Sequence, residues 1–178
     1  MATIVGVETD GGAVLAGDRL RVDEGTVHSR NERHVFDFGA VGAAAVGESG
    51  AVEEFRRRLE SEIRSHDTER DEPTSIGRLA TVASNLASEG VEAILAGRDD
   101  GRARVRGVDA SGGIVTDDRF AFGSGAEFAL GVLESGDADS VTDAEQLARE
   151  AIAAAADRDA GTGEDIDVYR LESESESG

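Results

Sequence analysis

The spacing of apolar residues changes repeatedly along the chain, and these changes limit the folds that the chain can adopt. Apolar residues alternate or run together in 3–46, 91–122 and 166–171, which is typical of β-strands. They recur every three or four residues in the segments between, which is typical of amphipathic helices. Such helices are predicted in four segments: 52–63, 76–86, 126–133 and 147–155. The order of strands, two helices, strands, two helices and a strand predicts an α+β fold, a four-layer αββα sandwich with a helix pair outside each of two sheets.

Local signals place several turns and helix ends. "TDGG" between 3–7 and 13–16 is typical of a hairpin, and the small residues of "AVGAAAVG" at 40–47 allow another layer to pack closely. Ser49 is a candidate N-cap, and "TDAE" at 142–145 is a candidate capping box. The polar stretch at 66–73 predicts a break between the first two helices, which Pro73 reinforces.

The charge of the chain argues against nucleic acid as a partner and indicates a high-salt setting. Its 178 residues include 38 acidic and 18 basic ones, all arginine, for a formal net charge of −20. Nucleic acid is not expected as a partner, because a polyanion is repelled by such a surface. An acidic chain without lysine fits a salt-loaded cytoplasm, where molar salt screens self-repulsion within a few ångströms.

The length and the remaining composition indicate one cytoplasmic domain. We expect a single domain over 1–171 and a disordered acidic tail, "ESESESG", over 172–178. The chain has no cysteine, which rules out disulfides and thiolate chemistry. No apolar stretch approaches the ~20 residues that span a bilayer, so no membrane association is expected.

Three motifs resemble the proteasome core-particle family, specifically β-type subunits of the archaeal kind, which are N-terminal-nucleophile hydrolases. They are "TIVGVETDGGAVLAGDR" from Thr3, "FGSGAEFALGVLE" at 122–134 and "DRDAGTGEDIDVYRL" at 157–171. The extra N-terminal helix of α-type subunits is absent from this sequence. The resemblance implies a threonine protease fold, a homo-oligomer or a ring with α- and β-type subunits, and no cofactor or metal.

The resemblance assigns each catalytic position of the family to a residue of this chain. In the family an N-terminal threonine attacks the scissile carbonyl, its own amine handles the proton, and a lysine paired to an aspartate tunes the local pKa values. The resemblance puts this aspartate at Asp18, the oxyanion-hole glycine at Gly47 and the serine of the glycine-serine-glycine turn at Ser124. The aspartate and hydroxyl that hold the amine fall on Asp159 and Thr162, where serine is usual.

Two positions depart from the family pattern. The nucleophile position holds Ala2, which has no hydroxyl, and the lysine position holds His34. The chain contains no lysine that could supply the missing ammonium group. A histidine can nevertheless act as a base near neutral pH. Met1 directly precedes Ala2, whose small size permits removal of the methionine, so the expected mature N-terminus is an alanine.

Thr3 is an alternative nucleophile. Side chains alternate faces along a strand, so Thr3 is expected to face away from the position of Ala2. A bulge or trimming of Ala2 could redirect the terminus. We therefore keep two hypotheses. In the first, the chain is a non-catalytic ring component. In the second, it is an active hydrolase that uses Thr3 after loss of Met1 and Ala2, and only this second hypothesis implies a peptide substrate.

Each candidate residue also has a simpler interpretation. Asp18 could pair with Arg19 or Arg21, and Ser124 could cap the helix that follows it. His28 and His34 lack a third clustered ligand and are more typical of ordinary strand residues than of a metal site. The 157–167 segment does not fit a calcium loop, and "GAVGAAAVGESG" lacks the lysine of a phosphate loop.

Overall fold

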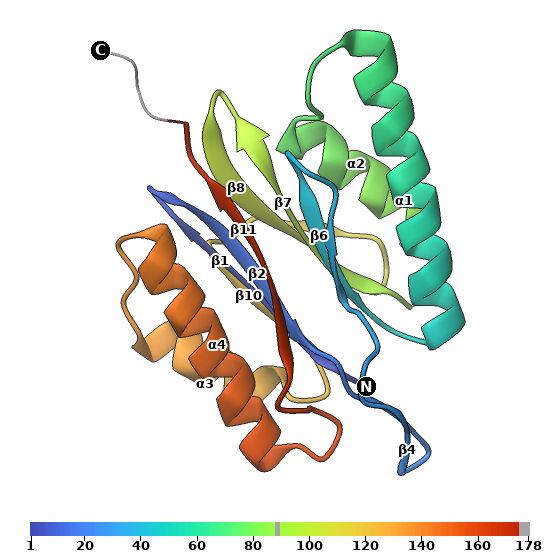
Figure 1. Ribbon diagram of the computed structural model, residues 1–178, viewed down its shortest axis with the longest axis vertical. Helices are drawn as coiled ribbons and strands as arrows, with labels where there is room; N and C mark the ends of the chain where they lie inside the picture. Colours follow the sequence, from blue (N-terminus) through green and yellow to red (C-terminus); the bar gives the residue numbers. More distant parts are fainter. Residues whose placement is uncertain (88–89, 175–178) are drawn as a thin grey trace.

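Two antiparallel sheets form the centre of the molecule (Figure 1). The computed structural model describes residues 1–87 and 90–174. One sheet has the strand order β10-β1-β2-β11 and the other has the order β5-β6-β7-β8-β9, while β3 and β4 pair as a separate hairpin. The strands are β1 (Thr3–Thr9), β2 (Gly12–Asp18), β3 (Arg21–Asp23), β4 (Thr26–Ser29), β5 (Val35–Asp37), β6 (Gly42–Val46), β7 (Glu92–Asp99), β8 (Arg102–Val108), β9 (Ile114–Val115), β10 (Arg119–Gly123) and β11 (Ile166–Glu172).

In the described part of the chain, four helices cover the outer faces of the sheets (Figure 1). α1 and α2 share one apolar cluster with the five-stranded sheet, and α3 and α4 share another with the four-stranded sheet. A third cluster lies between the sheets. The helices are α1 (Ser49–Arg70), α2 (Ile76–Leu86), α3 (Ala126–Ser135) and α4 (Val141–Arg158). The α+β class predicted from the periodicity is confirmed.

Small residues allow the sheets to approach closely, as the alanine- and glycine-rich run at 40–47 predicts. A Cβ at Gly42 in β6 would lie 2.5 Å from the ring of Tyr169 in β11. A Cβ at Gly6 in β1 would lie 2.6 Å from Ile94 in β7. Any larger side chain at these positions would push the layers apart.

The start and end of α1 and the start of α4 differ from the predicted caps and from the predicted break. α1 begins at Ser49, so Glu48 and not Ser49 is its N-cap, and it continues through the polar residues to Arg70. The N-cap of α4 is Ser140, whose side chain accepts the N–H of Asp143, and not Thr142 of the predicted capping box. The cap lies earlier because Val141 is buried against β2 beside Gly12.

The C-terminal segment is ordered beyond the predicted closing strand. β11 includes Glu172, the N–H of Ser173 donates to Gly11, and the N–H of Glu174 donates to Gly101. Residues 175–178 of the predicted tail lie outside the described residues.

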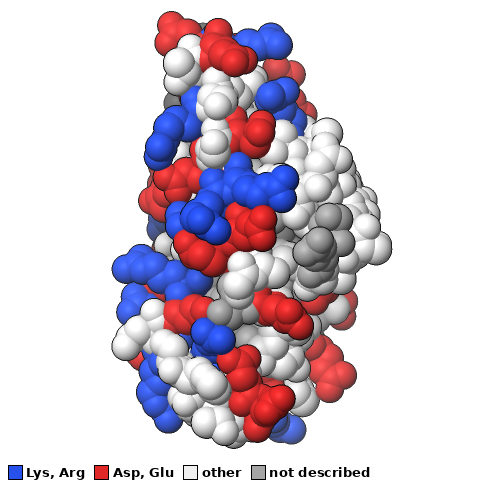
Figure 2. Space-filling model, turned by 90° about the vertical axis from the view of Figure 1, so that its right-hand side faces the viewer, with Lys and Arg blue, Asp and Glu red and all other residues white. Residues whose placement is uncertain are grey.

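Charged side chains are interspersed on the surface. Figure 2 shows the side that carries α1, where arginine and acidic side chains lie next to one another. On α1, Arg56 pairs with Glu53 and Glu60, and Arg64 also pairs with Glu60. None of the helices in 1–87 and 90–174 is both long and apolar enough to cross a bilayer.

Candidate functional site

The N-terminal end of β1 borders a cavity of about 280 Å³. Ala2 lies on its wall and is 2% exposed, with its methyl group in the apolar cluster between the sheets. Gly47, at the end of β6, also lines the cavity, with φ at +153°. The cavity is lined by Met1, Ala2, Leu20, Arg21, Val22, Asp23, Glu32, His34, Gly47, Glu48, Val52 and Gly90.

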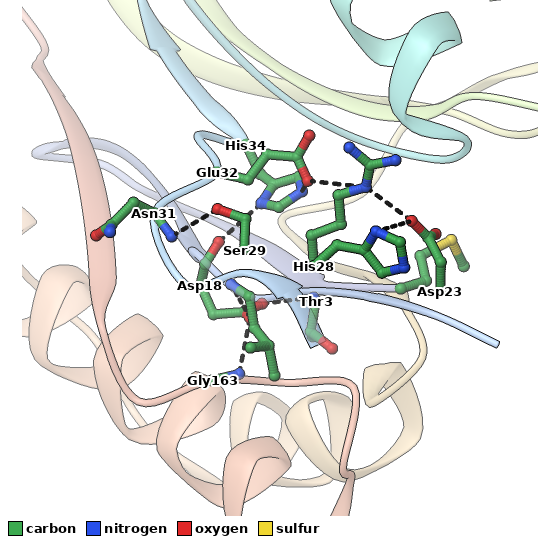
Figure 3. A network of polar contacts seen from close by, with 12 residues as sticks. Thr3, Asp18, Asp23, His28, Ser29, Asn31, Glu32, His34 and Gly163 are labelled. Atoms are coloured by element: carbon green, nitrogen blue, oxygen red, sulfur yellow. Dashed lines mark hydrogen bonds and ion pairs between the residues drawn. The ribbon is translucent and has the colours of Figure 1, made fainter. Parts of the chain in front are cut away.

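Asp18 lies at the end of β2 and is fully buried (Figure 3). Its Oδ1 accepts the N–H of Thr3 at 2.8 Å, and its Oδ2 accepts the N–H groups of Leu20 at 3.0 Å and Gly163 at 2.7 Å. Burial raises the pKa of this carboxyl above its usual 3.8, although the three hydrogen bonds act in the opposite direction. The carboxylate therefore joins β1, β2 and the loop before β11.

No arginine in the described residues forms an ion pair with Asp18. Arg19 instead binds Asp167 through two nitrogens, and Arg21 binds Asp23. The simpler interpretation of Asp18, as a turn carboxylate paired with one of these arginines, is therefore wrong.

His34 lies at the position where the sequence resemblance predicts a lysine, and it contacts the backbone and an acidic side chain (Figure 3). Its Nδ1–H donates to the backbone carbonyl of Asp18 at 2.8 Å, and not to the Asp18 carboxylate. Its Nε2 lies 3.8 Å from Glu32, which also faces Arg21 at 3.9 Å. His28 lies 3.9 Å from Asp23 in the same network. The cavity is therefore lined by opposite charges, with no cation bound to the buried carboxylate.

Thr3 faces the side of β1 that is opposite to Ala2. It is fully buried and does not line the cavity. Its Oγ1 lies 2.8 Å from Thr162 Oγ1 and accepts the N–H of Gly125 at 2.9 Å. Because Thr162 donates to the Asp159 carboxylate at 2.7 Å, the Thr3 hydroxyl donates to Thr162. These hydrogen bonds use both the proton and a lone pair of Thr3.

Ser124 lies beside the N-terminus. Its hydroxyl is within hydrogen-bonding distance of the Met1 carbonyl and of the Asp159 carboxylate. It does not cap α3, whose N-cap is Gly125. Although partial burial opposes the effect, the Ser124 and Thr162 hydroxyls and the charge of the N-terminal amine lower the pKa of Asp159 below 3.8.

The structure thus brings the predicted residues to one end of β1, but on two sides of it. Ala2, His34 and Gly47 border the cavity, and Thr3, Ser124, Asp159 and Thr162 lie on the other side. Asp18 joins the two groups through the N–H of Thr3.

Sequence reasoning missed the backbone groups at this site, among them the N–H of Gly125, the N–H of Gly163 and the carbonyl of Met1. Any residue type carries such groups, so only the glycines that allow close approach could have indicated them. It also missed the charged ring of Arg21, Asp23 and Glu32, although the mixed charges of "RVDE" and "NERH" were visible.

Within the described part of the chain, no cluster of three or more histidine or acidic side chains is arranged to hold a metal ion. His28 and His34 make separate contacts with Asp23 and Glu32.

The fold and the site define a class of protein. Paired antiparallel sheets with outer helices, and a first strand whose N-terminus meets a buried aspartate, are features of N-terminal-nucleophile hydrolases. A sequence profile described as "Proteasome subunit" matches residues 1–171, and the chain belongs to this family.

Similar proteins with a curated name are β-type subunits. The chain is 37% identical over 180 residues to "Proteasome subunit beta" of Halorhabdus utahensis, covering 97% of this chain and 77% of that protein. It is 35% identical over 181 residues to "Proteasome subunit beta 2" of Haloarcula marismortui, covering 97% and 78%. It is 34% identical over 177 residues to "Proteasome subunit beta" of Halobacterium salinarum, covering 95% and 73%. The sources of these relatives suggest the same high-salt setting as the acidic composition.

Proposed function

We propose that this chain is a non-catalytic β-type component of a proteasome ring, with a structural or regulatory role in cytoplasmic proteolysis. The central observation is that Ala2, and not a hydroxyl-bearing residue, borders the cavity at the end of β1. Attack on a peptide carbonyl needs a nucleophile at this position, and a methyl group cannot supply one.

The second missing group supports the same proposal. Asp18 is buried and retains three backbone donors, yet no lysine exists to pair with it. His34 donates its Nδ1–H to the backbone carbonyl of Asp18, and its Nε2 lies beside Glu32, so it supplies no cation to the buried Asp18 carboxylate. In this proposal Asp18, Ser124, Asp159 and Thr162 hold the N-terminus in place, and Gly47 keeps the shape of an oxyanion hole that is not used.

The arrangement of layers is part of the proposal. The apolar clusters on both outer faces and between the sheets fit the four-layer αββα sandwich of this class, formed by one domain over residues 1–171. Assembly then depends on the outer surfaces and sheet edges, which do not require the missing chemistry.

The alternative is an active hydrolase that uses Thr3. Burial of Thr3 and the engagement of its hydroxyl by Thr162 and Gly125 weigh against it. To act, Thr3 would have to lose Ala2, leave both partners and turn to the opposite face of β1.

Three measurements on the purified protein test the proposal. We expect an intact mass that begins at Ala2 or Met1, co-isolation with α-type proteasome subunits at high salt, and no turnover of fluorogenic peptides. A mature chain that begins at Thr3, together with peptide turnover that Thr3→Ala abolishes, would establish the alternative. Failure to associate with α-type subunits would remove the ring role.

A further inference from the structure

A short strap formed by Ser173 and Glu174 joins the two sheets at the end of the molecule where β11 finishes (Figure 1). The N–H of Ser173 donates to the carbonyl of Gly11, in the turn between β1 and β2, at 3.0 Å. The N–H of Glu174 donates to the carbonyl of Gly101, in the turn between β7 and β8, at 2.7 Å. β1 and β2 belong to one sheet and β7 and β8 to the other, so the strap ties together two hairpins from different sheets.

The hydroxyl of Ser173 lies at the open edge of β8. Its Oγ accepts the N–H of Ala103 at 3.0 Å. A phosphate oxygen in the same place would accept this N–H more strongly, because hydrogen bonds to a charged acceptor are shorter and stronger than neutral ones. The position of Ser173 is therefore compatible with a phosphate on its hydroxyl.

The strap lies beside arginine side chains of β7 and β8, namely Arg98, Arg102 and Arg104. The first donates two N–H groups to the carbonyl of Glu172 at 2.8 and 3.1 Å. The other two flank Ala103 in the sequence and turn toward the β1–β2 hairpin, where they bind Asp10 at 2.6 Å and Glu8 at 3.2 Å. Positive charge therefore approaches the strap from both of the strands that it crosses.

The ion pair between Arg102 and Asp10 is open to solvent, with the two side chains 50% and 95% exposed. Exposed ion pairs of this kind contribute little to stability. A phosphate on Ser173 has a larger negative charge than a carboxylate, and the strap would hold it at the edge of β8. It can therefore take Arg102 from Asp10 at little cost.

The sequence around Ser173 is a recognition signal for an enzyme with a basic groove. In "ESESES" at 172–177, Ser173 lies between Glu172 and Glu174. Arginine clusters bind acidic segments of this kind. The strap is also close to the end of the chain, where local opening breaks few contacts and makes a side chain accessible to a modifying enzyme.

We propose that Ser173 is a phosphorylation site and that its phosphate binds the N–H of Ala103 and the guanidinium of Arg102, which fastens the strap to β8. The phosphoryl donor is a nucleoside triphosphate held by a serine kinase with a basic substrate groove. Ser173 Oγ bonds to the γ-phosphorus, the bond from that phosphorus to the leaving nucleoside diphosphate breaks, and a carboxylate of the kinase takes the hydroxyl proton.

The product carries a charge of about −1.5 to −2 at pH 7 and three acceptor oxygens. Opposite arginine side chains, such a group forms new charge-assisted hydrogen bonds and orders the segment that carries it. This role goes beyond the proposed function and does not depend on whether the chain is catalytic.

Ser61 is a matched control within the same chain. It also lies between two glutamates, Glu60 and Glu62, but in the middle of α1. Opening the chain there would expose Leu59 and Ile63, which are buried in the apolar cluster under α1. We therefore expect no phosphate on Ser61, although its flanking residues are the same as those of Ser173.

Peptide mass spectrometry on the protein purified from a haloarchaeal expression host tests the site. Trypsin cleaves after arginine and releases residues 171–178, which contain Ser173, Ser175 and Ser177, and residues 59–64, which contain Ser61. We expect a phosphate that fragmentation assigns to Ser173, and no phosphate at this position in Ser173→Ala. An unmodified 171–178 peptide, or phosphate confined to Ser175 or Ser177, would overturn the site. Equal phosphorylation of Ser61 would overturn selection by the strap.

Thermal unfolding at constant high salt, before and after phosphatase treatment, tests the contacts of the phosphate. Removal should lower the melting temperature by about 2–4 °C, a shift of the order that one such contact produces in a domain of this size. The shift should fall to less than half in Arg102→Gln and disappear in Ser173→Ala. Arg30→Gln is the control and should keep the full shift, since Arg30 is exposed beside the β3–β4 hairpin. A melting temperature that stays constant or rises on removal of the phosphate would show that it does not fasten the strap.

Discussion

In the proposed function, Ala2 and His34 are the two residues that separate this site from a threonine protease site. Both lie on the cavity wall, while the hydrogen bonds around Asp18 and Asp159 remain complete. On this proposal, the hydrogen-bonded framework is present without the reacting groups. The proposed inactivity can therefore be tested by introducing those groups.

We expect the double variant Ala2→Thr with His34→Lys to gain peptidase activity once Met1 is removed. The lysine would find the buried Asp18 carboxylate as its partner, and the threonine would face the cavity. Activity is measured with a fluorogenic peptide at high salt, and removal of Met1 is checked by mass. Ala2→Thr alone should be slower by about 10²-fold or more, because the proton-handling pair is missing.

His34→Lys alone is the control and should be inactive. Equal activity in Ala2→Thr and the double variant would contradict the role assigned to the lysine position.

Asp159 is predicted to stabilise the fold only above acidic pH. Its pKa is lowered in the folded protein, so its contribution is complete above the unfolded value, near 3.8, and disappears as the pH falls through the folded pKa. Asp159→Asn should cost about 1.5–3 kcal/mol at pH 7, the range for hydrogen bonds to a charged group. Urea unfolding from pH 7 to pH 2 at constant high salt would follow the difference between wild type and variant.

That difference should shrink below pH 4. Glu164→Gln is the control, since Glu164 is exposed in the same loop and its loss should change stability little. A difference that is independent of pH would show that Asp159 acts through packing and not through its charge.

At the scale of elements, side chains protect the open edge of β8. The N–H of Val105 donates to Glu8 of β1 at 2.8 Å, and the N–H of Ala103 donates to Ser173 at 3.0 Å. Glu8 also binds Arg104 at 3.2 Å. These contacts join the two sheets and leave fewer free backbone groups at this edge.

Glu8→Ala should therefore destabilise the fold by about 1–3 kcal/mol, because the partly buried N–H of Val105 loses its acceptor. Guanidinium unfolding measures the change. Glu8→Gln keeps an oxygen acceptor and should recover part of the loss. If the two variants are equally destabilised, the charge of Glu8 matters and the hydrogen bond to Val105 does not.

The end of α1 shows why element boundaries were only partly predictable. The helical spacing is followed by Val52, Phe55, Leu59 and Ile63. His66, three residues after Ile63, continues this spacing and is also buried. The prediction ended the helix because residues 66–73 are polar. The structure extends it to Arg70, where Thr74 donates to Asp67 at 3.1 Å and Asp71 adopts a left-handed conformation.

At the scale of the whole molecule, charge and salt control stability. With a net charge of −20, the acidic side chains of one chain repel one another. At low ionic strength this repulsion is poorly screened. The screening length falls from about 10 Å at 0.1 M salt to about 3 Å at 1 M. The melting temperature should therefore rise steeply with KCl concentration up to about 1 M and less above it.

Thermal unfolding followed by circular dichroism would measure this rise, with NaCl expected to give the same curve. Sucrose at matched osmolality is the control, because it does not screen charge. A melting temperature that does not depend on salt would contradict the inferred adaptation to a salt-loaded medium.

The sequence by itself determined the order of strands and helices, the α+β class and the absence of a hydroxyl and a lysine at two positions. These follow from hydrophobic period and from residue identity, which are local properties of the chain. Only the tertiary structure decided that Thr3 bonds to Thr162, that His34 bonds to a backbone carbonyl and that Asp18 holds three separate segments. Those contacts join residues far apart in the chain through backbone groups that every residue carries, so no sequence pattern distinguishes them.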